Sequence, residues 1–269
     1  MSTHSMRFGF GKNWESYVKQ YFSEERIEIS RKHLLEFLKI DNLQGKSFLD
    51  IGCGSGLHSL AALRSGAAKI VSFDFDPVAV QTATKLKEYA GNPVSWQVMQ
   101  GSILDKAFLN QFAPADIVYS WGVLHHTGAM WEAMDNAARL IKPGGLFYVA
   151  LYDYEIHVNP TPEFWLDVKQ RYNKAGWLGK RQMELWYIWR FNLHSNPLNL
   201  PTLLKMIVGY KQSRGMAFYP NLVDWLGGWP MEFAKRTDVA RWAERTNLEM
   251  LVMSTGGANT EYLFKRHVT

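Results

Sequence analysis

The stretch Phe48–Gly56, with the sequence FLDIGCGSG, constrains the fold of this chain more than any other. Its apolar positions are typical of a β-strand that is buried on both faces. Glycines follow at positions 52, 54 and 56, and because glycine has no Cβ, such a turn can adopt positive φ and let a ligand approach the backbone. A helical pattern begins at Leu57, so its free N–H groups would face the same ligand. Strand, glycine turn and helix together predict a nucleotide-type site on a doubly wound sheet.

The glycine spacing separates this site from two common nucleotide motifs. The dinucleotide fingerprint is G-x-G-x-x-G, and here Leu57 stands where its last glycine belongs. The chain also has no G-K-[ST] sequence, which excludes a P-loop. Asp74 ends the next predicted strand, 22 residues after Gly52, where a carboxylate can accept hydrogen bonds from both hydroxyls of a ribose. We therefore expect a ribose-bearing ligand and disfavour a nicotinamide dehydrogenase.

After residue 46, strand-like and helix-like patterns alternate along the chain. Strands are predicted near 47–51, 69–74, 94–100, 116–121 and 145–151, and helices near 57–65, 77–90, 105–112 and 130–141. Alternating strands and helices with short connections predict a parallel sheet. Pro143-Gly144-Gly145 predicts a turn before the fifth strand. Further on we predict a helix over 237–246 capped by Thr237, strands over 248–254 and 260–266, and a hairpin turn at 256–259.

Five motifs in a fixed order resemble the cofactor half of class I S-adenosylmethionine (SAM) dependent methyltransferases, especially the small-molecule type of ubiquinone and menaquinone biosynthesis. The motifs are LDIGCGSG at 49–56, VSFDFDP at 71–77, GSILD at 101–105, DIVYSWGVLHH at 116–126 and IKPGGLFYVALYD at 141–153. They cover roughly residues 45–153, and the final hairpin extends the resemblance more weakly to the C-terminus. The resemblance implies an α/β fold with a doubly wound, mostly parallel seven-stranded sheet. It also implies SAM as cofactor, S-adenosylhomocysteine (SAH) as product, and no metal.

The same resemblance assigns cofactor roles by motif position. Asp50 would anchor the glycine turn and reach the methionine amino group, and Asp74 would bind the ribose hydroxyls. The full set of expected cofactor-binding residues is Asp50, Gly52, Cys53, Gly54, Asp74, Phe75, Ser102, Ile103, Trp121 and Gly122. Ser102 stands where the family usually has an acidic residue that binds the adenine amino group, and its hydroxyl or a backbone N–H would take that role. We interpret Cys53, the only cysteine, as a small packed residue in the turn and not as a nucleophile.

Acceptor-side candidates follow the fourth and fifth strands, because ligands bind at strand carboxyl ends in open α/β sheets. His125 and His126 are the first candidates for a general base, with Tyr152 as a further catalytic candidate; the alternative is that the two histidines only cap or pack the next helix. Other expected acceptor-binding residues are Asp153, Tyr154, Asp224, Trp225, Trp14 and Tyr17. We predict that Asp224–Pro230 forms a loop that enters the pocket. Trp14 and Tyr17 would cover the cofactor, or else pack in the core.

The chain divides into four predicted segments. Residues 1–45 form an N-terminal helical cover with helices near 13–22 and 24–40, and residues 46–151 form the SAM-binding core. Residues 152–236 form a mainly helical, aromatic-rich insertion between strands five and six, with helices near 162–175, 179–193 and 200–213. Residues 237–269 complete the core. In the second helix, Ser23 is the predicted N-cap and Ile29 belongs to the predicted apolar face.

The composition and net charge limit which partners and which cellular compartment we expect for this protein. The chain has 269 residues, 47% of them hydrophobic, a net charge of +5 and one cysteine, and it lacks a secretory signal, so we expect a cytoplasmic protein. The insertion carries most of the basic excess, which suits a solvated surface or an anionic partner.

We predict that the protein transfers a methyl group to an oxygen, or to a nitrogen, of a small molecule. Sugar, peptide or RNA acceptors and a noncatalytic SAM-binding subunit remain alternatives. Nucleic acid is the less favoured partner, peripheral membrane contact is an option, and a monomer or homodimer is expected.

Overall fold

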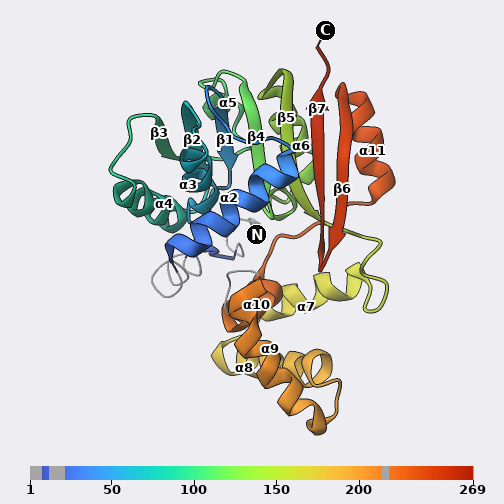
Figure 1. Cartoon of the computed structure of the whole chain (residues 1–269). Helices are drawn as coiled ribbons and strands as arrows, with labels where there is room; N and C mark the ends of the chain where they lie inside the picture. The colour runs from blue at the N-terminus through green and yellow to red at the C-terminus, as the bar shows by residue number, and fades with distance from the viewer. Residues whose placement is uncertain (1–7, 12–21, 214–217, 269) are drawn as a thin grey trace.

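The centre of the molecule is one seven-stranded sheet with the strand order β3-β2-β1-β4-β5-β7-β6 (Figure 1). The computed structural model describes residues 8–11, 22–213 and 218–268. The strands are β1 (Ser47–Ile51), β2 (Lys69–Asp74), β3 (Trp96–Gln100), β4 (Ala115–Trp121), β5 (Ile141–Tyr152), β6 (Leu248–Gly256) and β7 (Asn259–Arg266). β1 to β5 are mutually parallel, and β7 runs antiparallel to both β5 and β6. The predicted doubly wound, mostly parallel sheet is confirmed.

Helices cover both faces of the sheet, which explains why the central strands read as continuous apolar runs. One face is covered by α2 (Glu24–Leu38), α3 (Leu57–Arg64) and α4 (Pro77–Tyr89). The other is covered by α5 (Lys106–Leu109), α6 (Met130–Arg139) and α11 (Arg236–Arg245). The strand order reverses between β1 and β4, so the turn after β1 lies at the topological switch point, where open α/β sheets bind ligands.

The insertion between β5 and α11 consists of helices, as predicted, and we call it the cap. Its elements are α7 (Pro162–Lys174), α8 (Trp177–Tyr187), the π-helix η3 (Ile188–Asn192), the 3₁₀ turn η4 (Pro197–Asn199), α9 (Leu200–Ser213) and α10 (Phe218–Gly227). Trp165, Tyr172 and Leu226 form part of its separate apolar core. Figure 1 shows the cap beyond one end of the sheet, with α8 and α9 farthest from it.

Two expectations about the insertion are corrected. The expected helix over 179–193 begins earlier, at Trp177, and is α-helical only to Tyr187 before it widens into η3. The expected loop Asp224–Pro230 is half helix, because α10 continues to Gly227. The end of α10 is stabilised from α7, where Asn173 Nδ2 donates a hydrogen bond of 2.7 Å to the carbonyl of Gly227. Such a contact between distant segments leaves no local signal in the sequence.

Helix ends follow the sequence in some places and not in others. Ser23 is the N-cap of α2, as predicted, and its hydroxyl accepts the N–H of Arg26. Thr237 is not an N-cap, because α11 starts one residue earlier and the carboxylate of Glu155 accepts the N–H of Arg236 instead. Ile29 is 54% exposed and does not belong to the buried face of α2. The predicted helix over 13–22 lies almost entirely outside the described residues.

The fifth strand also differs from its prediction. Pro143-Gly144-Gly145 forms no turn before the strand, because β5 already begins at Ile141. The register against β4 shifts there, from Ala115 opposite Ile141 to Ile117 opposite Leu146. This irregularity accommodates the extra residues and the positive φ of Gly144 (+75°) inside the strand. The hairpin turn between β6 and β7 lies where it was predicted, at residues 257 and 258.

Candidate active site

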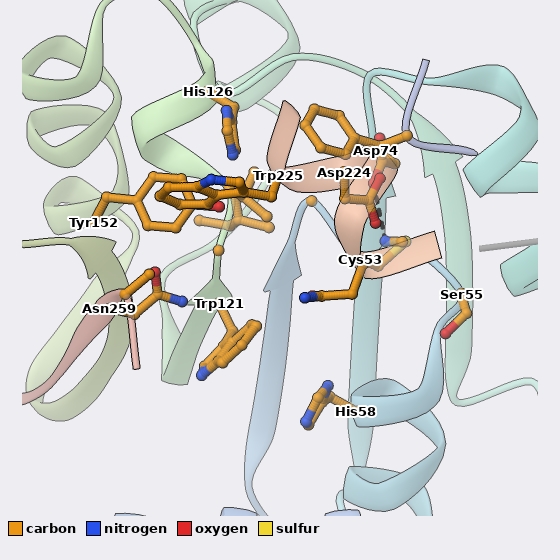
Figure 2. Close-up of a pocket in the computed structure, with 18 of the residues that line it drawn as sticks. Cys53, Ser55, His58, Asp74, Trp121, His126, Tyr152, Asp224, Trp225 and Asn259 are labelled. Atoms are coloured by element: carbon orange, nitrogen blue, oxygen red, sulfur yellow. Dashed lines mark hydrogen bonds between the residues drawn. The ribbon is translucent and has the colours of Figure 1, made fainter. Parts of the chain in front are cut away.

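A cavity of about 1230 Å³ lies at the carboxyl ends of the parallel strands, beneath the cap. The glycine turn, the ends of β2 to β5, α2, α3, the segment Phe8–Phe10, three cap helices and the β6–β7 hairpin all contribute to its lining. The predicted site residues among the lining are Asp50, Gly52, Cys53, Gly54, Asp74, Phe75, Ser102, Ile103, Trp121, Gly122, His126, Tyr152, Asp224 and Trp225. In Figure 2, Cys53 and Asp74 lie on one side of the cavity, and Tyr152 and Asn259 lie on the other.

The glycine turn is held against the end of β2 by backbone hydrogen bonds. The N–H groups of Gly52 and Cys53 both donate to the carbonyl of Phe73, at 2.8 and 3.1 Å. Gly52 has a φ of +72°, and a Cβ there would lie 2.3 Å from a methyl carbon of Val123. Only glycine fits this position. Burial raises the pKa of the Cys53 thiol well above its usual range, which supports a packing role for it.

Asp74 connects the glycine turn to the end of β2. Its Oδ2 accepts the N–H of Gly54 at 2.9 Å, and its Oδ1 accepts the N–H of Asp76 at 2.9 Å. Burial raises the pKa of this carboxyl group, while the backbone N–H groups of Asp76 and Gly54 oppose that shift. Each carboxylate oxygen can accept a further hydrogen bond. Asp74 therefore presents two acceptors to the cavity, as binding of a ribose diol requires.

Asp50, at the carboxyl end of β1, is buried and belongs to a chain of hydrogen-bonded side chains. The hydroxyl of Ser59 donates to its Oδ2 at 2.5 Å, and the hydroxyls of Ser59 and Ser72 are 2.6 Å apart. Trp96 Nε1 donates to Ser72 at 2.8 Å and ends the chain. Burial raises the pKa of Asp50 to about 7, although the Ser59 hydrogen bond lowers it. This carboxylate therefore gains from a cationic group in the cavity, and the amino group of SAM is such a group.

The region after β3 completes the cofactor side of the cavity. The Ser102 hydroxyl accepts the N–H of Leu104 at 3.1 Å and keeps its own hydrogen to donate. Ile103 is buried beside it, and Phe75 is 45% exposed within the lining. This group provides an apolar surface with one hydroxyl, a surface suited to a flat adenine ring.

The end of β4 supplies Trp121 and Gly122. Trp121 Nε1 donates to Glu261 Oε1 at 2.8 Å, and the hydroxyl of Tyr148 donates to Glu261 Oε2 at 2.9 Å. Glu261 belongs to β7 and also lines the cavity. The closing hairpin therefore orients the tryptophan that ends the fourth strand.

The two adjacent histidines of η2 (Leu124–His126) have different environments. His126 lines the cavity, and its Nδ1 lies 2.7 Å from the carbonyl oxygen of Pro230. A carbonyl only accepts, so Nδ1 carries the hydrogen and neutral His126 has its lone pair on Nε2. His125 is completely buried and absent from the lining, and burial lowers its pKa well below the usual range. Of the two histidines, His126 lines the cavity and His125 does not.

The cap side of the cavity is aromatic. The rings of Tyr152 and Trp225 are 5.6 Å apart, and His157 stacks on Trp225 at 5.6 Å. The Trp225 indole N–H is buried and has no hydrogen-bond partner among the described residues, so this residue contributes its ring to the cavity wall. Burial raises the pKa of Tyr152, and the charge of Asp224 raises it further. Tyr152 therefore stays protonated and is suited to hold an acceptor, not to take its proton.

Asp153 and Tyr154 lie outside the cavity lining, contrary to expectation. Asp153 is 1% exposed and forms an ion pair of 2.7 Å with Arg236, which helps to lower its pKa. Tyr154 donates to Glu163 at 3.2 Å. We no longer assign these two residues to the acceptor. Trp14 and Tyr17 lie outside the described residues.

Several residues line the cavity without having been predicted from the sequence, among them Phe10, His58, His157 and Asn259. Phe10 packs 4.9 Å from His126 across the site, although nothing in the sequence links the two. His58 carried a weak signal as the second residue of the helix after the glycine turn, and burial lowers its pKa to about 4. Within the described part of the chain, no group of three or more metal-ligating side chains occurs.

The fold and the site define a class I SAM-dependent methyltransferase. The family model described as "Methyltransferase domain" matches residues 21–207, and the chain belongs to this family. Among curated relatives, a ribosomal protein L11 methyltransferase of Photobacterium profundum is 35% identical over 114 residues, which cover 41% of this chain and 35% of the relative. A ubiquinone biosynthesis O-methyltransferase of Rhizobium rhizogenes is 31% identical over 134 residues, 48% of this chain and 52% of the relative. The chain thus spans about a third to a half of these proteins.

Solved structures agree on the fold. The SAH-bound magnesium protoporphyrin IX methyltransferase of Synechocystis PCC 6803 has a TM-score of 0.55 and 14% identity, covering 95% of this chain and 93% of that one. An O-methyltransferase family protein from Burkholderia thailandensis has a TM-score of 0.55 and 15% identity, covering 90% of this chain and 57% of that one. At such low identity the likeness concerns the fold alone.

Proposed function

We propose that this protein transfers the methyl group of SAM to an oxygen atom of a small-molecule acceptor. The observation that carries the proposal is that the glycine turn and Asp74 line the same cavity as His126, Tyr152 and Trp225. SAM, when bound, supplies both the methyl group and the leaving group. The residues of the chain then have two tasks, which are alignment of the acceptor and removal of its proton.

The residues on the cofactor side of the cavity have the chemical groups that binding of SAM would need. The glycine turn admits close approach to the backbone, Asp74 offers two acceptors for a ribose, and Asp50 offers a buried carboxylate for the amino group. Ser102, Ile103 and Phe75 would contact the adenine, and Trp121 and Gly122 would border the methyl group. We propose no metal in this site. The division into an N-terminal cover, core, cap and closing hairpin stays a prediction.

In the proposed reaction, His126 accepts the acceptor's hydroxyl proton on Nε2 while the new carbon–oxygen bond forms and the carbon–sulfur bond of SAM breaks. The hydrogen bond between Nδ1 and Pro230 fixes the ring and stabilises the charge that develops on it. Tyr152 and Trp225 hold the acceptor between their rings, and the Tyr152 hydroxyl is available to hydrogen-bond it. The cap above the cavity favours a small acceptor over a folded protein or an RNA duplex.

The test is an acceptor screen that measures SAH release from SAM with phenols, sugars and short peptides. The proposal expects turnover with a hydroxyl-bearing small molecule. His126→Gln should lower kcat about 100-fold or more with SAH affinity unchanged, and the exposed His267→Gln serves as control. Binding of SAH with no turnover on any acceptor would instead favour a noncatalytic SAM-binding subunit. Turnover on peptides alone would move the function towards the protein-modifying relatives.

A further inference from the structure

The part of the cap farthest from the sheet exposes many large apolar side chains. Leu198 is 82% exposed, Trp177 and Leu178 are each 69% exposed, and Leu185 is 66% exposed. Soluble surfaces rarely gather so many apolar residues on neighbouring elements. We call α8, η3, η4 and α9 up to residue 208, with these side chains, the cap face.

The charges around these side chains have one sign. Between Asp167 and Asp224 the sequence has nine lysine or arginine residues and one acidic residue, Glu184. Glu184 is buried and accepts hydrogen bonds from Tyr172 and Arg181, so it presents no carboxylate to a partner. The exposed cations on or next to the cap face include Lys174, Arg190 and Lys205.

We propose that the cap face binds the surface of an anionic phospholipid bilayer. Tryptophan and leucine side chains beside a cationic surface are the composition of helices that lie in the membrane interface. The cations would attract lipid phosphates, and the apolar side chains would enter the boundary between head groups and acyl chains. Within the described chain, no helix is long and apolar enough to cross a membrane, which is compatible with binding in the plane of the interface.

Two other occupants fit these observations less well. A second copy of the chain would bring cationic surface against cationic surface in a two-fold contact, which costs energy. RNA would use the cations and stack its bases on aromatic rings, but most of the exposed apolar side chains here, such as Leu178, Leu198 and Leu204, are aliphatic and provide no stacking surface. An anionic bilayer matches both the positive charge and the aliphatic side chains of the cap face.

The experiment is flotation of the full chain with vesicles of phosphatidylcholine, or of phosphatidylcholine and phosphatidylglycerol in equal amounts. We expect the mixed vesicles to bind at least about tenfold more tightly at low salt, with the difference shrinking as salt rises. The double variant Arg190→Glu/Lys205→Glu should weaken this binding at least about 25-fold. Trp177→Ser/Leu178→Ser should weaken it roughly tenfold.

Matched controls come from exposed positions on the core, Val94→Ser for the apolar change and Lys46→Glu for the charge change. Both should bind like the wild type, and an unchanged melting temperature would verify that each variant folds. Equal binding of neutral and anionic vesicles, no binding of either, or equal losses in the controls would overturn the proposal. So would a dimer in sedimentation that Trp177→Ser/Leu178→Ser dissociates, or RNA binding that displaces the vesicles. None of these readouts depends on methyl transfer, so the result is independent of the proposed function.

Discussion

Replacement of Asp74 tests the proposed SAM site most directly, because this side chain has two separable roles. It accepts backbone N–H groups around the glycine turn, and we propose that it binds the ribose. In Asp74→Ala, the N–H groups of Gly54 and Asp76 both lose their acceptor. A ribose bound as we propose would also lose both of its hydrogen bonds to this carboxylate. A hydrogen bond to a charged group contributes about 1.5–3 kcal/mol. Loss of two such bonds to the ribose corresponds to about 3 kcal/mol or more, so we expect at least about a 100-fold weaker SAH affinity.

Asp74→Asn separates the two roles, because the amide keeps one accepting oxygen. One backbone N–H then faces an NH₂ group and loses its acceptor, while the ribose keeps a neutral hydrogen bond. Affinity should therefore fall in the order wild type, Asn, Ala. The assay is calorimetric titration with SAH at pH 8, where Asp50, with a pKa raised to about 7, is mostly ionised.

The control for this series is Asp105→Ala. Like Asp74, Asp105 accepts a backbone N–H, that of Phe108 at 3.1 Å, where it is the N-cap of α5, but it lies outside the cavity lining. Its loss should cost about 1 kcal/mol of stability and leave SAH affinity unchanged. The assignment of Asp74 to the ribose would be refuted by a folded Asp74→Ala protein that binds SAH about as well as the wild type.

Three further predictions concern the turn, the cofactor and the cap. Gly52→Ala places a Cβ 2.3 Å from a Val123 methyl carbon on a backbone with positive φ. The substitution should therefore lower the free energy of unfolding by about 1–3 kcal/mol and weaken SAH binding at least tenfold. Titration and melting curves like those of the wild type would contradict this. SAH affinity should rise from pH 6 to pH 8 as Asp50 ionises with a pKa of about 7, and a flat calorimetric profile would argue against its contact with the amino group. Burial lowers the pKa of Lys169 to about 7, below its unfolded value, so the unfolded chain binds more protons above pH 7 and stability rises with pH there. Relative to Lys169→Met, wild-type stability in urea should therefore gain up to about 1.4 kcal/mol per pH unit between pH 7 and 10, and equal slopes would refute the shift.

The sequence predicted best those elements whose signal is local. The bounds of β1 and β2 agree with the prediction because most of their residues are buried, and because a glycine follows β1 directly and an aspartate ends β2. The glycine turn and Asp74 lie on consecutive βα units, so their meeting follows from the fold class alone. Ser23 was identifiable for the same reason, since an N-cap acts on N–H groups two or three residues away.

Features set by distant contacts were not predictable in this way. The partner of His126 is the carbonyl of Pro230, 104 residues away, so the pattern LHH could not distinguish His126 from the fully buried His125. Thr237 looked like an N-cap, but Glu155 from the start of the insertion accepts the first helical N–H. Ile29 has the helical spacing of the apolar residues that α2 buries, but its side chain lines the cavity instead.

The end of α10 shows how the cap and the site depend on each other. The buried Lys169 of α7 donates a hydrogen bond to the carbonyl of Trp225, and its Nζ lies 4.4 Å from the centre of the Trp225 ring. One side chain thus caps the last turn of α10 and holds the indole that faces the cavity. Burial lowers the pKa of Lys169 to about 7, and its contacts with Trp225 offset part of the cost of burying it. Because α8 packs against both α7 and α10, the proposed membrane-binding face and the helices that carry Lys169 and Trp225 belong to one packed unit.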